Sequence, residues 1–178
     1  MCSSDLALSV WNDYYKLLTR AGLAKKAFME GMSRGGVYVY RWAATYPQRV
    51  AAVYADAPVL DLKSWPGGMG QSKESPETWK IFKEDFNLKT ENEAVAFKGN
   101  PIDMTRKIAK SGFSMLHIVG DADNVVPVSE NTALFEQRIK AAGGSIQVIH
   151  KPGIGHHPHS LLNPQPIVDF IMKIQNNK

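Results

Sequence analysis

The sequence predicts a three-layer α/β fold in which helices cover both faces of a parallel sheet, and three observations support this. Four short apolar runs have the composition of strands, at residues 27–30, 50–55, 114–119 and 145–150. Stretches with helical spacing separate them, which is typical of parallel strands joined by right-handed crossovers. Reactive side chains follow directly after several of the runs, and the carboxyl edge of such a sheet is where sites form.

The first residues predict a helix that packs on the sheet, over residues 6–21. Its apolar side chains recur at three- and four-residue steps, as in an amphipathic helix: Leu6, Val10, Trp11, Tyr14, Leu17 and Leu18. A short polar stretch, residues 22–26, then leads into the first strand.

A serine between two glycines follows the first strand, in the pattern Gly31-x-Ser33-x-Gly35. A serine on a sharp turn from strand to helix adopts a strained backbone, and small residues two positions away leave room for that turn. A helix starting there would direct its N–H groups toward an anion formed nearby. Ser33 is therefore a candidate nucleophile, although two glycines around a serine also occur in ordinary loops.

The segment after Ser33 gives conflicting signals. Residues 37–40 alternate like a strand. An exposed Ser33, however, requires a helix to begin directly after it, and we expect a helix over residues 34–46. Pro47 ends this helix before the second strand.

A long excursion, residues 58–112, separates the second and third strands. It exceeds a simple crossover in length, so we expect a helical cap over the site. Within it we expect one helix at residues 76–86 and another after the polar run 89–93. Most of its large aromatic residues would pack the excursion against the body: Trp65, Trp79 and Phe82.

The remaining chain supplies two strands and two helices. The third strand ends in an acidic turn, residues 120–127, before a helix at 129–142. The fourth strand ends in a loop that contains His156. A last helix, residues 167–175, has apolar side chains suited to cover the sheet.

A serine hydroxyl needs a base, and the base needs an acid that fixes its ring. The order Ser33, Asp123, His156, each after a strand, resembles the carboxyl-terminal part of an α/β-hydrolase-fold serine hydrolase of the esterase and prolyl-oligopeptidase-like branch. The similarity covers residues 25–174 and depends on three motifs: Gly31 to Gly36, Gly120-x-x-Asp123-x-x-Val126-Pro127 and Gly153-x-Gly155-His156. It implies Ser33 as nucleophile, Asp123 as acid, His156 as base and the backbone N–H of Arg34 as an oxyanion donor.

Other acids compete for the role of Asp123. Asp121 lies on the same turn, but the family pattern places the acid three residues before the Val-Pro pair. Asp56 and Asp61 follow the second strand, where some related hydrolases have their acid. Outside such a role, short acids at these positions cap turns.

The histidines near residue 156 raise the possibility of a metal, because imidazole is a common zinc ligand. A catalytic zinc usually has three protein ligands, and the chain has one cysteine, Cys2, and no H-E-x-x-H or C-x-x-C element. We therefore predict no metal and no cofactor. His157 and His159 would shape the mouth of the site, and His117 and His150 would be core or edge residues.

Length and composition predict one domain, residues 1–178, because 178 residues with 44% hydrophobic content can bury one core. No apolar run is long enough for a membrane span, and the first residues lack the pattern of a secretory signal. The formal charge is +4, but basic and acidic residues are interleaved, so we expect neither nucleic acid nor a membrane as partner. The compartment is left open.

The resemblance also implies that strands are missing before residue 27, including the loop that supplies a second oxyanion donor. The chain would then be a fragment whose first strand has an unpaired edge. We expect self-association through that edge and hydrolysis reduced on the order of a hundredfold or more.

The leading functional hypothesis is a serine hydrolase that cleaves an ester, of a small molecule or a glycan, through an acyl-enzyme. The alternative within the same chemistry is a prolyl-oligopeptidase-like serine peptidase. The alternative from another class is a non-catalytic interaction module, or an inactive fragment, that keeps the fold.

Overall fold

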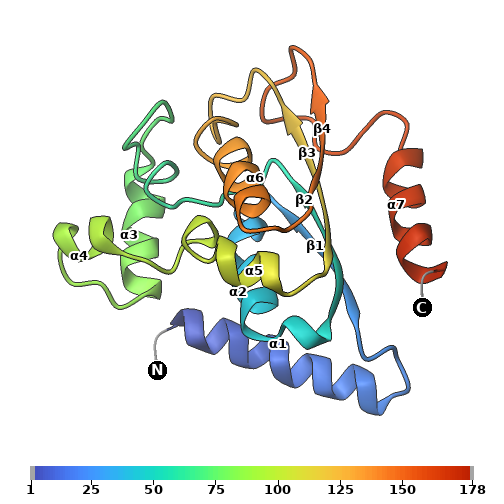
Figure 1. Cartoon of the computed structure of the whole chain (residues 1–178). Coiled ribbons are helices and arrows are strands. Elements are labelled where there is room, and N and C mark those ends of the chain that lie inside the picture. Colours follow the sequence, from blue (N-terminus) through green and yellow to red (C-terminus); the bar gives the residue numbers. More distant parts are fainter. Residues whose placement is uncertain (1–2, 177–178) are drawn as a thin grey trace.

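The computed structural model describes residues 3–176, which form one four-stranded parallel sheet (Figure 1). Its strands are β1 (Ala27–Met32), β2 (Val50–Asp56), β3 (Ser114–Gly120) and β4 (Gln147–Lys151), in that spatial order. All four predicted strands are confirmed, with ends shifted by one or two residues. The lone cysteine, Cys2, lies outside the described residues.

Seven α-helices accompany the sheet in the described part of the chain. They are α1 (Ser3–Arg20), α2 (Gly35–Thr45), α3 (Pro76–Asp85), α4 (Glu91–Ala96), α5 (Thr105–Lys110), α6 (Thr132–Ala141) and α7 (Gln165–Asn176). Short 3₁₀ helices lie at Pro47–Arg49 and Pro101–Asp103. Among these helices, none has the length and apolar character needed to cross a bilayer.

Helices cover both faces of the sheet, as the three-layer prediction requires. On one face α2, α5 and α6 pack against β2 and β3 and form the main core. Figure 1 shows α7 on the opposite side of the strands from these helices. There α7 contributes Ile167, Phe170 and Ile171 to a second cluster with Leu116 and Ile118 of β3.

The first helix forms as predicted but does not bury the whole predicted face. Its Tyr15 ring lies 5.8 Å from Trp42 of α2, and that side of the helix is packed. Val10, Tyr14 and Leu17, predicted on the buried face, are 57%, 60% and 62% exposed. In the described residues β1 pairs only with β2, so the other edge of β1 has no partner strand.

The strand-like alternation at residues 37–40 belongs to α2, and the reason is burial on two sides. Val39 and Tyr40 face the main core, whereas Val37 packs into a separate cluster with the insert. A helix buried between two layers is apolar around most of its circumference, which removes the helical period from its sequence.

The insert, residues 58–112, packs on the body through aromatic side chains, as predicted. Trp79 and Phe82 of α3 are nearly fully buried beside Val37 and Val126, and Trp65 packs against the same cluster. The rings of Trp79 and Phe82 lie 4.9 Å apart. Burial of one such ring contributes about 2 kcal/mol.

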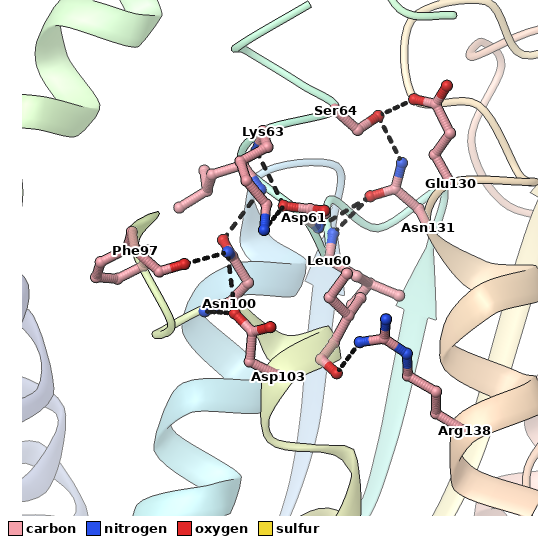
Figure 2. Close-up of polar contacts among 12 residues, drawn as sticks. Leu60, Asp61, Lys63, Ser64, Phe97, Asn100, Asp103, Glu130, Asn131 and Arg138 are labelled. Atoms are coloured by element: carbon pink, nitrogen blue, oxygen red, sulfur yellow. Dashed lines mark hydrogen bonds and ion pairs between the residues drawn. The ribbon is translucent and has the colours of Figure 1, made fainter. Parts of the chain in front are cut away.

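Two buried asparagines fix the first turn of the insert (Figure 2). The Asn131 side-chain oxygen accepts hydrogen bonds from the N–H groups of Leu60 and Asp61 at 2.8 and 3.1 Å, and its amide donates to Ser64. Asn100 accepts from the N–H of Leu62 at 3.1 Å. Because Asn131 precedes α6, its bonds tie the insert to the body, whereas the Asn100 bond lies within the insert.

A second buried polar group lies inside the main core. The His117 ring on β3 contacts the Tyr40 hydroxyl on α2 at 2.6 Å and the Thr132 hydroxyl on α6 at 3.0 Å. Burial lowers the pKa of His117 to about 3, so the ring is neutral at pH 7. His117 is thus a satisfied core histidine, as predicted.

Candidate active site

Ser33 occupies the turn between β1 and α2, directly after the last residue of the strand. Its φ is 48°, the strained left-handed conformation that the glycine-flanked motif predicts. The Ser33 N–H donates to the Asp56 carbonyl at 2.9 Å, and the Ser33 carbonyl accepts from the Val59 N–H at 2.9 Å. Backbone bonds to the end of β2 and to the following segment therefore hold the strained residue.

The glycines around Ser33 differ in what they do. A Cβ on Gly31 would lie 2.8 Å from the Gly35 carbonyl oxygen and from a methyl of Val39, so this position excludes a side chain. Gly35 has open space where a Cβ would be, contrary to the expectation that both glycines make room for the turn. The second crowded position is Gly36, where a Cβ would meet the side chain of Pro58 at 2.5 Å.

The structure brings Ser33, His156 and Asp123 together in one hydrogen-bonded row. The Ser33 hydroxyl lies 3.0 Å from Nε2 of His156, and Nδ1 of His156 lies 2.7 Å from Oδ2 of Asp123. The Asp123 and His156 side chains are only 1% and 8% exposed. His156 Nδ1–H donates to the carboxylate, which leaves the Nε2 lone pair to accept the Ser33 proton.

The acid is held by its own turn and by the loop of the base. The other carboxylate oxygen of Asp123 accepts from the N–H groups of Val125 and Val126 at 2.9 and 2.8 Å. The Ala122 N–H donates to the Ile154 carbonyl at 2.9 Å, which joins the two loops. All strands are parallel, so the carboxyl ends of β1, β3 and β4 meet at one edge, and this explains the convergence.

The pKa of Asp123 reflects two opposed effects. Burial alone would raise it, but the hydrogen bonds from His156 and from the Val126 N–H outweigh burial and hold the pKa below its ordinary value. The carboxylate is therefore ionised over the neutral range and can stabilise a positive charge on His156.

The backbone N–H of Arg34 lies next to Ser33 at the start of α2. Within residues 3–176 this N–H donates to no protein acceptor. It is available to an anion beside the serine, where the positive end of the helix dipole adds to its effect.

The rival acids have other partners. Asp121 pairs with His150 at 2.6 Å, and both side chains are substantially exposed, at 41% and 51%. Asp61 accepts from the Lys63 N–H at 3.0 Å in the first turn of the insert. Neither of these two acids hydrogen-bonds to His156.

Asp56 makes a pair that the sequence analysis did not predict. This fully buried carboxylate accepts from Nδ1 of His159 at 2.9 Å, from the Ser160 N–H at 2.6 Å and from the Tyr54 hydroxyl at 2.8 Å. Burial first, and the Asp56 bond second, raise the pKa of that hydroxyl well above its ordinary value. The sequence does show Asp56 at the end of a strand and His159 three residues after His156. Neither position alone predicts that the two side chains meet.

His156 belongs to a cluster of three histidines, with His157 and His159. One ring nitrogen from each of His156, His157 and His159 lies within 4.8 Å of the others. The ring centroids are 4.7 to 5.2 Å apart. His157 is exposed, as expected for a residue at the mouth of the site.

Cavities lie on two sides of the molecule. One of about 40 Å³ adjoins Arg34 and is walled by side chains of α2 and the insert, including Tyr38, Leu62, Trp65 and Phe82. Another, of about 630 Å³, is lined by the first residues of β3 and β4, Ser114 and Gln147. The larger one is therefore at the opposite edge of the sheet from Ser33.

Comparison with known families decides the affiliation. The model of the prolyl oligopeptidase family matches residues 16–174. This chain belongs to the prolyl oligopeptidase family. A comparison with curated protein sequences gives no match.

Solved structures show the same fold for this prolyl oligopeptidase family member. A puromycin-hydrolyzing peptidase of Mycobacterium tuberculosis matches with a TM-score of 0.66 at 16% identity, over 81% of this chain and 21% of that one. The Pyrococcus horikoshii acylaminoacyl peptidase matches with 0.60 at 18% identity, over 81% and 22%. The Paleococcus ferrophilus monoacylglycerol lipase matches with 0.60 at 17% identity, over 96% and 76%. The chain thus spans about a fifth of the length of these peptidases and about three quarters of the lipase.

Proposed function

We propose that this chain is a serine hydrolase that transfers the acyl group of its substrate to Ser33 and then to water. The observation that supports this best is the row from the Ser33 hydroxyl through His156 to Asp123, with distances of 3.0 and 2.7 Å. Such a row has the geometry of a nucleophile, a general base and an acid that orients the base. Ser33 is the nucleophile, His156 the base and Asp123 the acid.

In the first half of the reaction, Nε2 of His156 takes the proton from Ser33 Oγ as that oxygen attacks the substrate carbonyl carbon. The carbonyl π electrons move to the oxygen, and the Arg34 N–H donates a hydrogen bond to the resulting oxyanion. Asp123 stabilises the imidazolium. The intermediate then collapses, the bond to the leaving group breaks, and His156 gives its proton to that group.

In the second half, water replaces the leaving group. His156 takes a proton from the water as its oxygen attacks the acyl-enzyme, and collapse returns Ser33 and releases the carboxylic acid. The proton on His156 returns to Ser33 Oγ, so the enzyme ends as it began. The φ of 48° at Ser33 keeps the hydroxyl in position through both halves.

An ester of a small acid is the substrate class we propose for this chain. An ester has a better leaving group than a peptide, so its cleavage requires less stabilisation of the oxyanion. The sequence points to only one oxyanion donor, the backbone N–H of Arg34, and this favours the ester. Peptide cleavage is the second candidate, and the match to the prolyl oligopeptidase family favours it.

Two measurements test these proposals. A fluorophosphonate probe should label the native chain at Ser33, and labelling should be lost in Ser33→Ala and weakened in His156→Gln. A chain that resists the probe would instead be a non-catalytic module. Turnover of p-nitrophenyl acetate should exceed that of an aminoacyl p-nitroanilide; a faster reaction with the anilide would favour the peptidase.

A further inference from the structure

The histidine cluster around the base has a feature that hydrolysis does not require. His156 and His159 each donate through Nδ1 to a buried carboxylate, Asp123 and Asp56, at 2.7 and 2.9 Å. Ser33 and a general base need only the first of these pairs. The second pair, with its acid fully buried, needs a different explanation.

A carboxylate that accepts from one ring nitrogen of a histidine fixes the tautomer and exposes the lone pair of the other nitrogen. In His156 and His159 that other nitrogen is Nε2. Metal-binding histidines in proteins have the same arrangement. A carboxylate that accepts from the nitrogen away from the metal orients the ring and makes the metal-binding nitrogen a stronger ligand. The two carboxylates also supply negative charge behind the rings, which offsets the charge of a divalent cation.

The third histidine completes the set. His157 lies on the same loop, and within residues 3–176 its exposed ring makes no hydrogen bond. Tetrahedral zinc with nitrogen ligands at about 2.0 to 2.1 Å needs ligand atoms about 3.4 Å apart. One ring nitrogen of each histidine lies within 4.8 Å of those of the other two, so coordination requires the His157 ring to rotate and the other two rings to shift until the ligand nitrogens are about 3.4 Å apart.

We propose that His156, His157 and His159 bind a divalent cation of the zinc class, and that this cation inhibits the hydrolase by occupying Nε2 of the base. The inhibitory part depends on the function proposed above. Nε2 of His156 has one lone pair, so it cannot both bind the metal and accept the Ser33 proton. The cation and the Ser33 proton therefore compete reversibly for Nε2 of His156. A chelator that removes the cation frees this nitrogen to act as the base again.

Calorimetric titration of the full chain, prepared without a polyhistidine tag, tests the site with Zn²⁺ as the probe. We expect one zinc per chain. In His157→Gln the affinity should fall about tenfold or more, as is common when one contributor to a metal site is lost. His150→Gln is the matched control because it also removes one histidine, but one paired with Asp121 outside the cluster, and its zinc affinity should equal that of the native chain.

Fluorophosphonate labelling tests the inhibition, with each variant compared with its own metal-free rate. Zinc should slow labelling of the native chain and of His150→Gln at the concentration at which it binds, and a chelator should restore the rate. Equal zinc affinity in His157→Gln, or unslowed labelling of a zinc-loaded chain, would overturn the proposal. Failure of the metal-free chain to label would refute the proposed hydrolase instead, and calorimetry alone would then decide the metal site.

Discussion

His117 should make the stability of this chain fall between pH 7 and pH 5. Burial lowers its pKa in the folded chain to about 3, whereas an unfolded histidine has a pKa of about 6.5. In this window the unfolded state binds a proton that the folded state does not, so acid favours unfolding. At pH 5 the difference reduces the free energy of unfolding by about 2 kcal/mol relative to pH 7. Asp123 does not add to this change, because its lowered pKa affects stability only below about pH 4.

Urea denaturation followed by tryptophan fluorescence at the two pH values measures this change. His117→Gln replaces the ring with a side chain that does not titrate, and the dependence on pH should become smaller by about 2 kcal/mol. An identical fall in stability in native chain and His117→Gln would refute the link between this buried ring and acid sensitivity.

Three further predictions follow from the site and its supports. Gly36→Ala places a methyl 2.5 Å from the side chain of Pro58 and should reduce the free energy of unfolding by about 1–3 kcal/mol. Gly35→Ala, where the added methyl meets open space, should not reduce it. Urea denaturation of the two variants measures the difference. Asn131→Leu leaves two backbone N–H groups unpaired and should cost about 1–3 kcal/mol, with faster proteolysis of the insert as a second readout. Asp123→Asn should slow ester hydrolysis by about 10³- to 10⁴-fold. Asp121→Asn, outside the row, should slow it far less, and equal losses in the two variants would contradict the choice of acid.

The strands and the meeting of Ser33, Asp123 and His156 could be predicted because they depend on short-range signals and one topological rule. Apolar runs between helical stretches indicate parallel strands, and parallel strands place the residues after them at one edge. The helix after Ser33 was predicted against its own alternation, because an exposed serine requires it. The aromatic packing of the insert followed from burial of large rings.

The rest depends on contacts across the chain, which no local pattern encodes. Asp56 and His159 are 103 residues apart, and Asn131 meets the insert across 71 residues. The spacing of its apolar residues predicted that the first helix packs on the sheet, yet Val10, Tyr14 and Leu17 of α1 are exposed, because a local pattern does not encode which layer covers a helix face. Gly36, rather than Gly35, is crowded because Pro58 approaches it from the next segment. Self-association through the free edge of β1 stays a prediction.

Labelling of the native chain by a fluorophosphonate, with the modified residue located by mass spectrometry, tests the proposed chemistry most directly. We predict one phosphonylated site, at Ser33, and none in Ser33→Ala. Modification at another serine, or none at all in a folded native chain, would contradict the role of the hydrogen-bonded row.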